Sequence, residues 1–150
     1  VPRPDGGANY SPRIVKWVSD KLNVNIPEPM IIGDGNLPHA VVVKVVIKKL
    51  MESNLYDFLY IAENKIPPIT LEGLAPIRAS QPNFKRAALP FWGVTKDCTL
   101  DLYYKENVSE LLELTHTCTE WTKGRCNACF QCNERSWAFS KLGINDPGKL

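Results

Sequence analysis

RCNACFQC, at residues 125–132, holds three of the chain's five cysteines, and Cys118 precedes Cys126 with seven residues in between. The spacing is therefore Cys-x7-Cys-x2-Cys-x2-Cys. Two residues between cysteines let both sulfurs of a pair turn toward one ion, and the longer loop lets Cys118 complete a tetrahedron. Because four thiolates leave no coordination position for water, the pattern at Cys118, Cys126, Cys129 and Cys132 predicts a structural zinc ion.

Other interpretations of the cysteines stay open at this point: an iron–sulfur cluster, a disulfide pair, or unconnected thiols in the core. Soft thiolates suit zinc and iron–sulfur clusters alike. A redox Cys-x2-Cys pair usually stands alone at the start of a helix, whereas further cysteines crowd this one. The fifth cysteine, Cys98, lies twenty residues before Cys118 and is predicted to be a buried thiol.

Length and composition limit the classes of protein to which the chain can belong. A chain of 150 residues has the size of one domain, in which we distinguish an α/β part at 1–115 and a zinc-binding segment at 116–150. A net charge of +2 is too small for a general nucleic-acid footprint, so direct nucleic-acid binding is not expected. The cysteines predict a reducing, cytoplasmic location, and no apolar run is long enough to span a membrane.

The hydrophobic pattern predicts five helices, at residues 11–22, 38–51, 97–105, 109–114 and 133–142. The segment 38–51 is rich in β-branched residues, which favours a strand, but its length and spacing favour a helix. An edge strand is predicted at 30–32. The continuous apolar run DFLYIA at 57–62 is typical of a strand buried on both faces of a parallel sheet, so it is the predicted central strand.

Three polar residues directly follow this predicted strand: Glu63, Asn64 and Lys65. Open α/β sheets bind ligands beyond the carboxyl ends of their strands, so these residues are predicted to lie at the mouth of a substrate site. A plain surface turn before the next prolines is the alternative.

The stretch 69–88 shows no clear period and is predicted to be a basic, polar loop. Its cationic residues are Arg78, Lys85 and Arg86. Guanidinium and ammonium groups match nucleotide phosphates or an anionic substrate, which makes them candidate substrate contacts. A solvated linker is the competing interpretation.

After the cysteines the sequence continues with NERSWAF at 133–139 and LGINDPG at 142–148. With the cysteine spacing, this resembles the C-terminal end of the 7-cyano-7-deazaguanine synthase family of PP-loop ATP pyrophosphatases. That family has an Arg three residues after its last cysteine, then an Ala-Phe pair and a closing Gly-x-x-Asp-Pro. The resemblance covers roughly the last third of the chain, and upstream only the order of elements agrees.

The resemblance implies an α/β fold, namely a three-layer parallel-sheet sandwich of the adenine nucleotide hydrolase type without its first strands, ending in a four-cysteine zinc knuckle. It implies a ligase of queuosine-type 7-deazapurine (preQ0) biosynthesis. Such an enzyme uses ATP and Mg²⁺ to adenylate the carboxylate of a deazapurine, lets ammonia displace AMP, and dehydrates the amide to a nitrile. A homo-oligomer is compatible with this family.

Lys96 stands where the family has a lysine that opens a helix, so the resemblance assigns it a catalytic role, and we place Asn64 with it. The family's Ser-Gly-Gly-x-Asp-Ser phosphate loop does not occur in these 150 residues. We therefore expect the chain to be N-terminally incomplete, with that loop upstream of Val1 and no ATP hydrolysis by these residues alone.

Two other functions compete with this hypothesis. A non-catalytic zinc-knuckle module would bind nucleic acid or protein through Lys123, Arg125 and Arg135, with Trp121 or Phe130 as a stacking platform. Another PP-loop enzyme, such as a tRNA-modifying ligase, would keep the ATP chemistry and change the acceptor.

Overall fold

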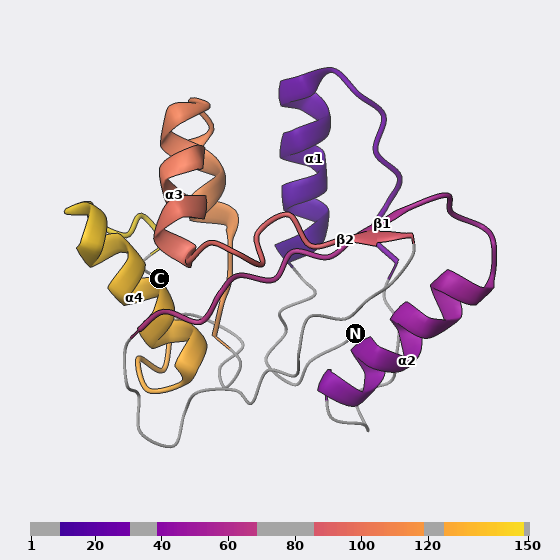
Figure 1. Ribbon diagram of the computed structural model, residues 1–150. Helices are drawn as coiled ribbons and strands as arrows, with labels where there is room; N and C mark the ends of the chain where they lie inside the picture. The colour runs from indigo at the N-terminus through magenta and orange to yellow at the C-terminus, as the bar shows by residue number, and fades with distance from the viewer. Residues whose placement is uncertain (1–9, 31–38, 69–85, 119–124, 149–150) are drawn as a thin grey trace.

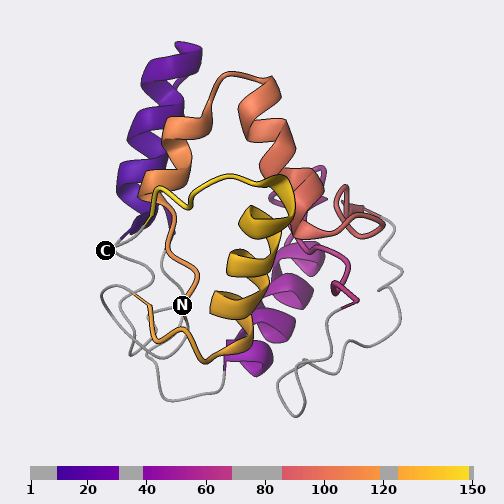
Figure 2. The same cartoon turned by 90° about the vertical axis from the view of Figure 1, so that its left-hand side faces the viewer.

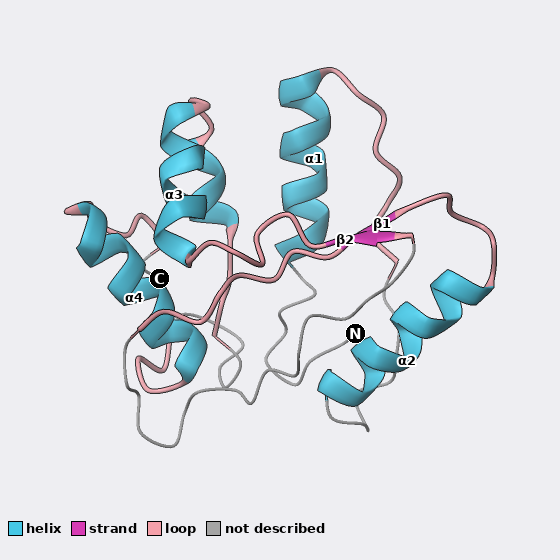
Figure 3. Ribbon diagram, in the orientation of Figure 1, coloured by secondary structure: helices cyan, strands magenta, loops and turns pink. Residues whose placement is uncertain are grey.

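The structure is a computed structural model that describes residues 10–30, 39–68, 86–118 and 125–148, without the side chains of 39–44. Its elements follow one another as α1 (Ser11–Leu22), α2 (His39–Glu52), β1 (Leu59–Tyr60), β2 (Ala87–Ala88), α3 (Lys96–Lys105), the 3-10 helix η2 (Ser109–Leu114) and α4 (Phe130–Leu142). The described chain is thus a mixed fold of helices and short strands, with a two-stranded parallel sheet and a cysteine cluster (Figure 3).

The predicted helices at 11–22, 38–51 and 97–105 are confirmed as α1, α2 and α3. The segment 109–114 forms a 3-10 helix. α4 begins three residues earlier than predicted because Cys129, in extended conformation, is its N-cap. Gly143 ends α4 in the left-handed conformation (φ 67°), and its N–H donates to the carbonyl oxygens of Phe139 and Ser140.

Asparagines follow the ends of the other three α-helices. Asn23, Asn54 and Asn107 have φ angles of 51°, 54° and 55°. A short polar side chain tolerates this left-handed conformation, which reverses the chain direction and lets the next N–H groups reach the last carbonyls. Beyond Asn107, for example, the Val108 N–H donates to the Tyr103 oxygen at 2.9 Å.

β1 and β2 pair in parallel, with Leu59 opposite Ala87 and Tyr60 opposite Ala88. The pairing brings the chain after β1 alongside the chain after β2. A further backbone hydrogen bond, from the Lys65 N–H to the Val94 oxygen at 2.9 Å, continues this alignment up to the start of α3. Asn64 is thereby carried to the N-terminal end of α3.

The prediction of a buried central strand at 57–62 is wrong. Only Leu59 and Tyr60 form β1, and Tyr60 and Phe58 remain 74% and 45% exposed. The prediction of an irregular loop is wrong at 87–88, which form β2, while 69–85 lie outside the described residues. The three-layer sandwich is not confirmed, since the sheet within the described ranges has two strands.

The hydrophobic core lies between α3, η2 and α4, which pack against one another (Figures 1 and 2). Its fully buried members are Leu100, Leu112, Ala138 and Phe139. α2 lies on the other side of the sheet from α3 and α4 in Figure 1. Cys98 is exposed on α3, so the prediction that it is a buried thiol is wrong.

Two further points from the sequence concern membrane-spanning helices and an edge strand. No helix in the described parts of the chain combines the length and apolarity needed to cross a bilayer. The edge strand predicted at 30–32 lies outside the described residues except for Met30, which has no regular secondary structure.

Candidate metal centre and adjoining cavity

The four predicted ligands meet at one point. The Sγ atoms of Cys118, Cys126, Cys129 and Cys132 all lie within 4.8 Å of one another. Four thiolates around one zinc ion, each with a Zn–S bond of about 2.3 Å, place their sulfurs about 3.8 Å apart. The Sγ atoms of Cys126 and Cys132 are 4.0 Å apart. None of the five cysteines forms a disulfide, and the four clustered sulfurs could hold a metal ion.

The turn between Cys126 and Cys129 aims backbone donors at a sulfur. Asn127 adopts a left-handed conformation (φ 55°), which reverses the chain direction. The N–H groups of Ala128 and Cys129 then donate to the Cys126 Sγ at 3.4 and 3.2 Å. These bonds hold the Cys126 sulfur in place within the cluster.

The other ligands are held by α4 and by the segment before residue 119. Cys129 is the N-cap of α4 and Cys132 lies in its first turn, which puts both sulfurs at the same end of the helix. Cys118, Cys129 and Cys132 are buried. Burial raises the pKa of the Cys132 thiol to about 12. A bound dication has the opposite effect, because it stabilises the thiolate directly.

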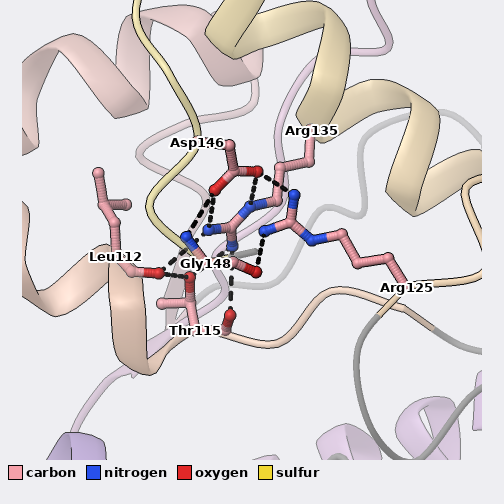
Figure 4. A network of polar contacts seen from close by, with 6 residues as sticks. All are labelled: Leu112, Thr115, Arg125, Arg135, Asp146 and Gly148. Carbon is pink, nitrogen blue, oxygen red and sulfur yellow. Dashed lines mark hydrogen bonds and ion pairs between the residues drawn. The ribbon is translucent and has the colours of Figure 1, made fainter. Parts of the chain in front are cut away.

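An arginine network lies beside the metal centre (Figure 4). The Arg135 guanidinium donates to both carboxylate oxygens of Asp146, from Nε and Nη2, at 2.8 Å each. It also donates to the Thr115 Oγ1 at 2.5 Å and to the Leu112 carbonyl oxygen at 3.0 Å. Arg125 forms a second ion pair with Asp146. Through Arg135 and Asp146, the network therefore joins α4, η2, Arg125 and the turn after α4.

The network also fixes the end of the described chain. Arg125 Nη2 donates to the Gly148 carbonyl oxygen at 2.7 Å. A Cβ atom at Gly148 would lie 2.7 and 2.8 Å from Nη2 of Arg135 and of Arg125, so a larger residue there would have to displace these guanidinium groups. Burial alone would raise the pKa of Asp146, but hydrogen bonds from Arg135 and Arg125 lower it to about 2. Asp146 is therefore a carboxylate at neutral pH.

A cavity of ≈ 350 Å³ lies next to these elements. Its walls are mainly apolar and include Phe91, Leu100, Tyr103 and Leu112. Its polar lining comes from separate segments and includes Asn64, Lys96, Thr99 and Thr117. Asn64 Nδ2 donates to the Thr99 Oγ1 at 3.2 Å, which orients the amide. The structure thus brings Asn64 and Lys96 to one cavity, beside the residue that precedes the ligand Cys118.

A partly buried ion pair stands at the cavity wall. The Lys96 Nζ lies 2.6 Å from the Glu134 Oε2, and their side chains are 20% and 4% exposed. Within the described residues, the buried Glu134 Oε1 and Thr117 Oγ1 have no hydrogen-bond partner. Leaving such an atom unpaired costs about 1–3 kcal/mol, and functional sites are one place where this cost is tolerated.

The remaining predicted site residues lie elsewhere. Glu63 and Lys65 flank Asn64 in sequence but do not line the cavity. Arg86 donates to the carbonyl oxygens of Met51 and Tyr56, so it ties the end of α2 to the segment before β1. Arg78 and Lys85 lie outside the described residues.

Phe130 and Arg135 are buried, so neither offers the surface contact that a nucleic-acid-binding knuckle would need. Lys123 and Trp121 lie outside the described residues.

Several residues of the site could not have been predicted from the sequence. Glu134 is a glutamate within a helix, a position that usually faces solvent. Thr99 and Thr117 belong to no motif. Asp146 and Arg135, in contrast, belong to the motif that carries the family resemblance, which could have suggested that they interact.

A second hollow, of ≈ 710 Å³, lies along α4 and the turn after it. Its charged residues, Arg125 and Asp146, already form an ion pair with each other. The smaller cavity therefore has the more suitable chemistry for a ligand, because it combines apolar walls with a few convergent polar groups. No protein-family profile, curated protein or solved structure matches this chain.

Proposed function

We propose that this chain is the zinc-stabilised part of an ATP-dependent enzyme similar to the 7-cyano-7-deazaguanine synthases, and that the cavity beside α3 binds its deazapurine. The observation that carries the proposal is the convergence of Asn64 and Lys96, from segments 32 positions apart, on one cavity next to the cysteine cluster. The cysteine spacing and the Gly-x-x-Asp-Pro ending support the same assignment.

Zinc is the metal that the cluster suits best. Sulfurs within 4.8 Å of one another fit a single tetrahedral ion. In an iron–sulfur cluster the cysteines bind different iron atoms, which sets their sulfurs further apart. With all four positions taken by thiolates, the ion has a structural role: it fastens the start of α4 to the segment that contains Thr117 and Cys118.

The cavity offers what a small heterocyclic acid needs. Its volume lies near the lower end of the range for small-molecule sites, about 300–1,000 Å³. Phe91 and Tyr103 provide aromatic walls, while Asn64 and Thr99 provide a hydrogen-bonding edge for ring nitrogens. Lys96 has donors left for an oxygen of the ligand's carboxyl group.

In the proposed reaction, ATP adenylates this carboxyl group, ammonia displaces AMP, and the amide is activated again and dehydrated to the nitrile. The role proposed for Lys96 is to stabilise negative charge at the reacting carbon's oxygen, and that for Asn64 is to hold the ring. ATP and Mg²⁺ would need a phosphate-binding loop that these 150 residues do not encode. A sandwich of the proposed type would likewise need strands beside β1 and β2.

The proposal predicts that the zinc-loaded chain binds 7-carboxy-7-deazaguanine, and that Asn64→Ala weakens this binding at least tenfold, or about 1.4 kcal/mol. The amide is lost from the cavity while the fold is kept, since Asn64 bonds only one side chain in the described structure. Isothermal titration calorimetry measures the affinity, and the melting temperature checks the fold.

The matched control is Asn25→Ala, which removes an exposed amide that does not line the cavity and should leave the affinity unchanged. ATP should show no micromolar binding to this chain. A wild-type chain that does not bind the deazapurine, or an Asn64→Ala variant with normal affinity, would contradict the proposal.

A further inference from the structure

Both cationic residues that line the cavity are paired with buried carboxylates. Lys96 lies 2.6 Å from Glu134, and Arg135 lies 2.8 Å from Asp146. Glu134 does not line the cavity itself but stands behind the lysine. The cavity therefore presents ammonium and guanidinium donors whose charge is already compensated, beside the exposed carboxylate of Glu106.

We propose that Glu134 determines the charge preference of the cavity: by neutralising Lys96, it makes the cavity favour uncharged ligands over their anionic counterparts. This rests on the cavity being the ligand site proposed above. The Glu134 side chain is 4% exposed, so little water lies around its carboxylate to screen it. A ligand anion that approaches Lys96 is attracted by the ammonium and repelled less strongly, from a greater distance, by the carboxylate behind it, so the pair attracts the anion less than a lone ammonium would.

The alternative role for Glu134 is only to fasten α4 to α3. A second ion pair between the same two helices, Lys141 with Asp97 at 2.6 Å, already serves that purpose. Asp97 is buried and does not line the cavity. The two pairs thus differ in one respect, since only Lys96–Glu134 places a charge at the cavity wall.

A neutral pair suits the proposed reaction. The ligand enters as a carboxylate anion and then becomes an amide and a nitrile, both uncharged. An uncompensated lysine would bind the carboxylate much more tightly than the amide, so fresh substrate would displace the amide before its second activation. Compensation by Glu134 weakens the competing anion and so removes this bias.

The test uses benzamide and benzoate, two probes of the same shape that differ in charge, titrated into the zinc-loaded chain and followed by ligand-observed NMR. The wild-type chain should bind benzamide at least as tightly as benzoate. Glu134→Gln keeps a hydrogen-bond acceptor for Lys96 but removes the negative charge, so it should tighten benzoate binding on the order of tenfold and leave benzamide within about twofold.

Two further variants separate charge from packing. In the double variant Lys96→Met with Glu134→Gln, the gain for benzoate should disappear because the ammonium is gone. Asp97→Asn breaks the other ion pair between α3 and α4 and should leave the ratio of the two affinities unchanged. Zinc content and melting temperature verify that each variant is folded.

The inference is overturned if the wild-type chain binds benzoate more tightly than benzamide, a result that does not depend on whether any variant folds. It is also overturned if Glu134→Gln weakens the binding of both probes equally, or if neither probe binds. A gain in benzoate affinity that persists when Lys96 is also replaced would overturn it as well. A benzoate gain in Glu134→Gln, with no binding of 7-carboxy-7-deazaguanine to any variant, supports the inference and refutes the proposed function.

Discussion

Replacing Cys129 by serine should release the bound zinc and lower the melting temperature by more than about 10 °C. Serine can still cap α4, so the loss reports the missing thiolate and not a missing N-cap. Without the ion, the metal link between the start of α4 and Cys118 is lost, which destabilises the neighbouring core of α3, η2 and α4. Elemental analysis and a circular dichroism melt measure the two effects, and a chelator should bring the wild-type chain to the same state.

Cys98→Ser is the matched control, because it changes an exposed cysteine outside the cluster. It should keep one zinc per chain and the wild-type melting temperature. If elemental analysis finds iron and sulfide in place of zinc, the four cysteines bind an iron–sulfur cluster. A metal-free wild-type chain, or full zinc content in the Cys129→Ser variant, would show that the four sulfurs do not bind an ion together.

Asp146→Asn should destabilise the chain by about 3 kcal/mol at pH 7, because it leaves two arginines without their shared counter-charge. The Arg135 and Asp146 side chains are only 3% and 7% exposed, so water cannot replace the carboxylate. The same substitution replaces one of the two carboxylate oxygens, which accept from Arg125, Arg135 and the Gly148 N–H, by an NH2 group that cannot accept a hydrogen bond. Urea unfolding of both chains, loaded with zinc, measures the difference in the free energy of unfolding.

The contribution of Asp146 to the free energy of unfolding depends on pH in a defined direction. The pKa of Asp146 is about 2 in the folded chain, below its ordinary value of 3.8. A lowered pKa means that the stabilisation is present above about pH 4 and is lost as the pH falls toward 2. The difference between the wild-type chain and Asp146→Asn should therefore be constant from pH 5 to pH 7 and shrink below about pH 4.

Glu113→Gln is the control for Asp146→Asn, since Glu113 is exposed and outside the network. Its free energy of unfolding should lie within about 0.5 kcal/mol of the wild-type value. Wild-type stability in Asp146→Asn would mean that the two arginines find other partners, and that the network of Figure 4 does not hold the end of the chain.

The metal centre and the helices follow from local sequence. Cysteines with two residues between them can reach one ion whatever surrounds them, so the spacing predicts the cluster. Helical periodicity predicts α1, α2 and α3, because each is specified within a few turns of chain. The left-handed end of α4 follows from Gly143 for the same reason.

The strand at 57–62 shows where local reasoning fails. An apolar run indicates a preference for burial, but only the neighbouring elements decide whether anything covers it, and Tyr60 stays exposed in the described structure. The prediction for Cys98 fails similarly, since this residue is exposed on α3 and takes no part in the core between α3 and α4. Both errors arise because burial is a property of the assembled fold.

The sequence by itself determined the four-cysteine cluster that could hold a metal ion, the helices, and the residues that were candidates for a site. Tertiary structure alone decided which of these residues meet. It placed Asn64 and Lys96 at one cavity and left Glu63 and Lys65 out of it. It also paired Lys96 with Glu134, thirty-eight residues away. No local pattern encodes such a pair, because the contact depends on how α3 packs against α4, and that packing is set by the core between them.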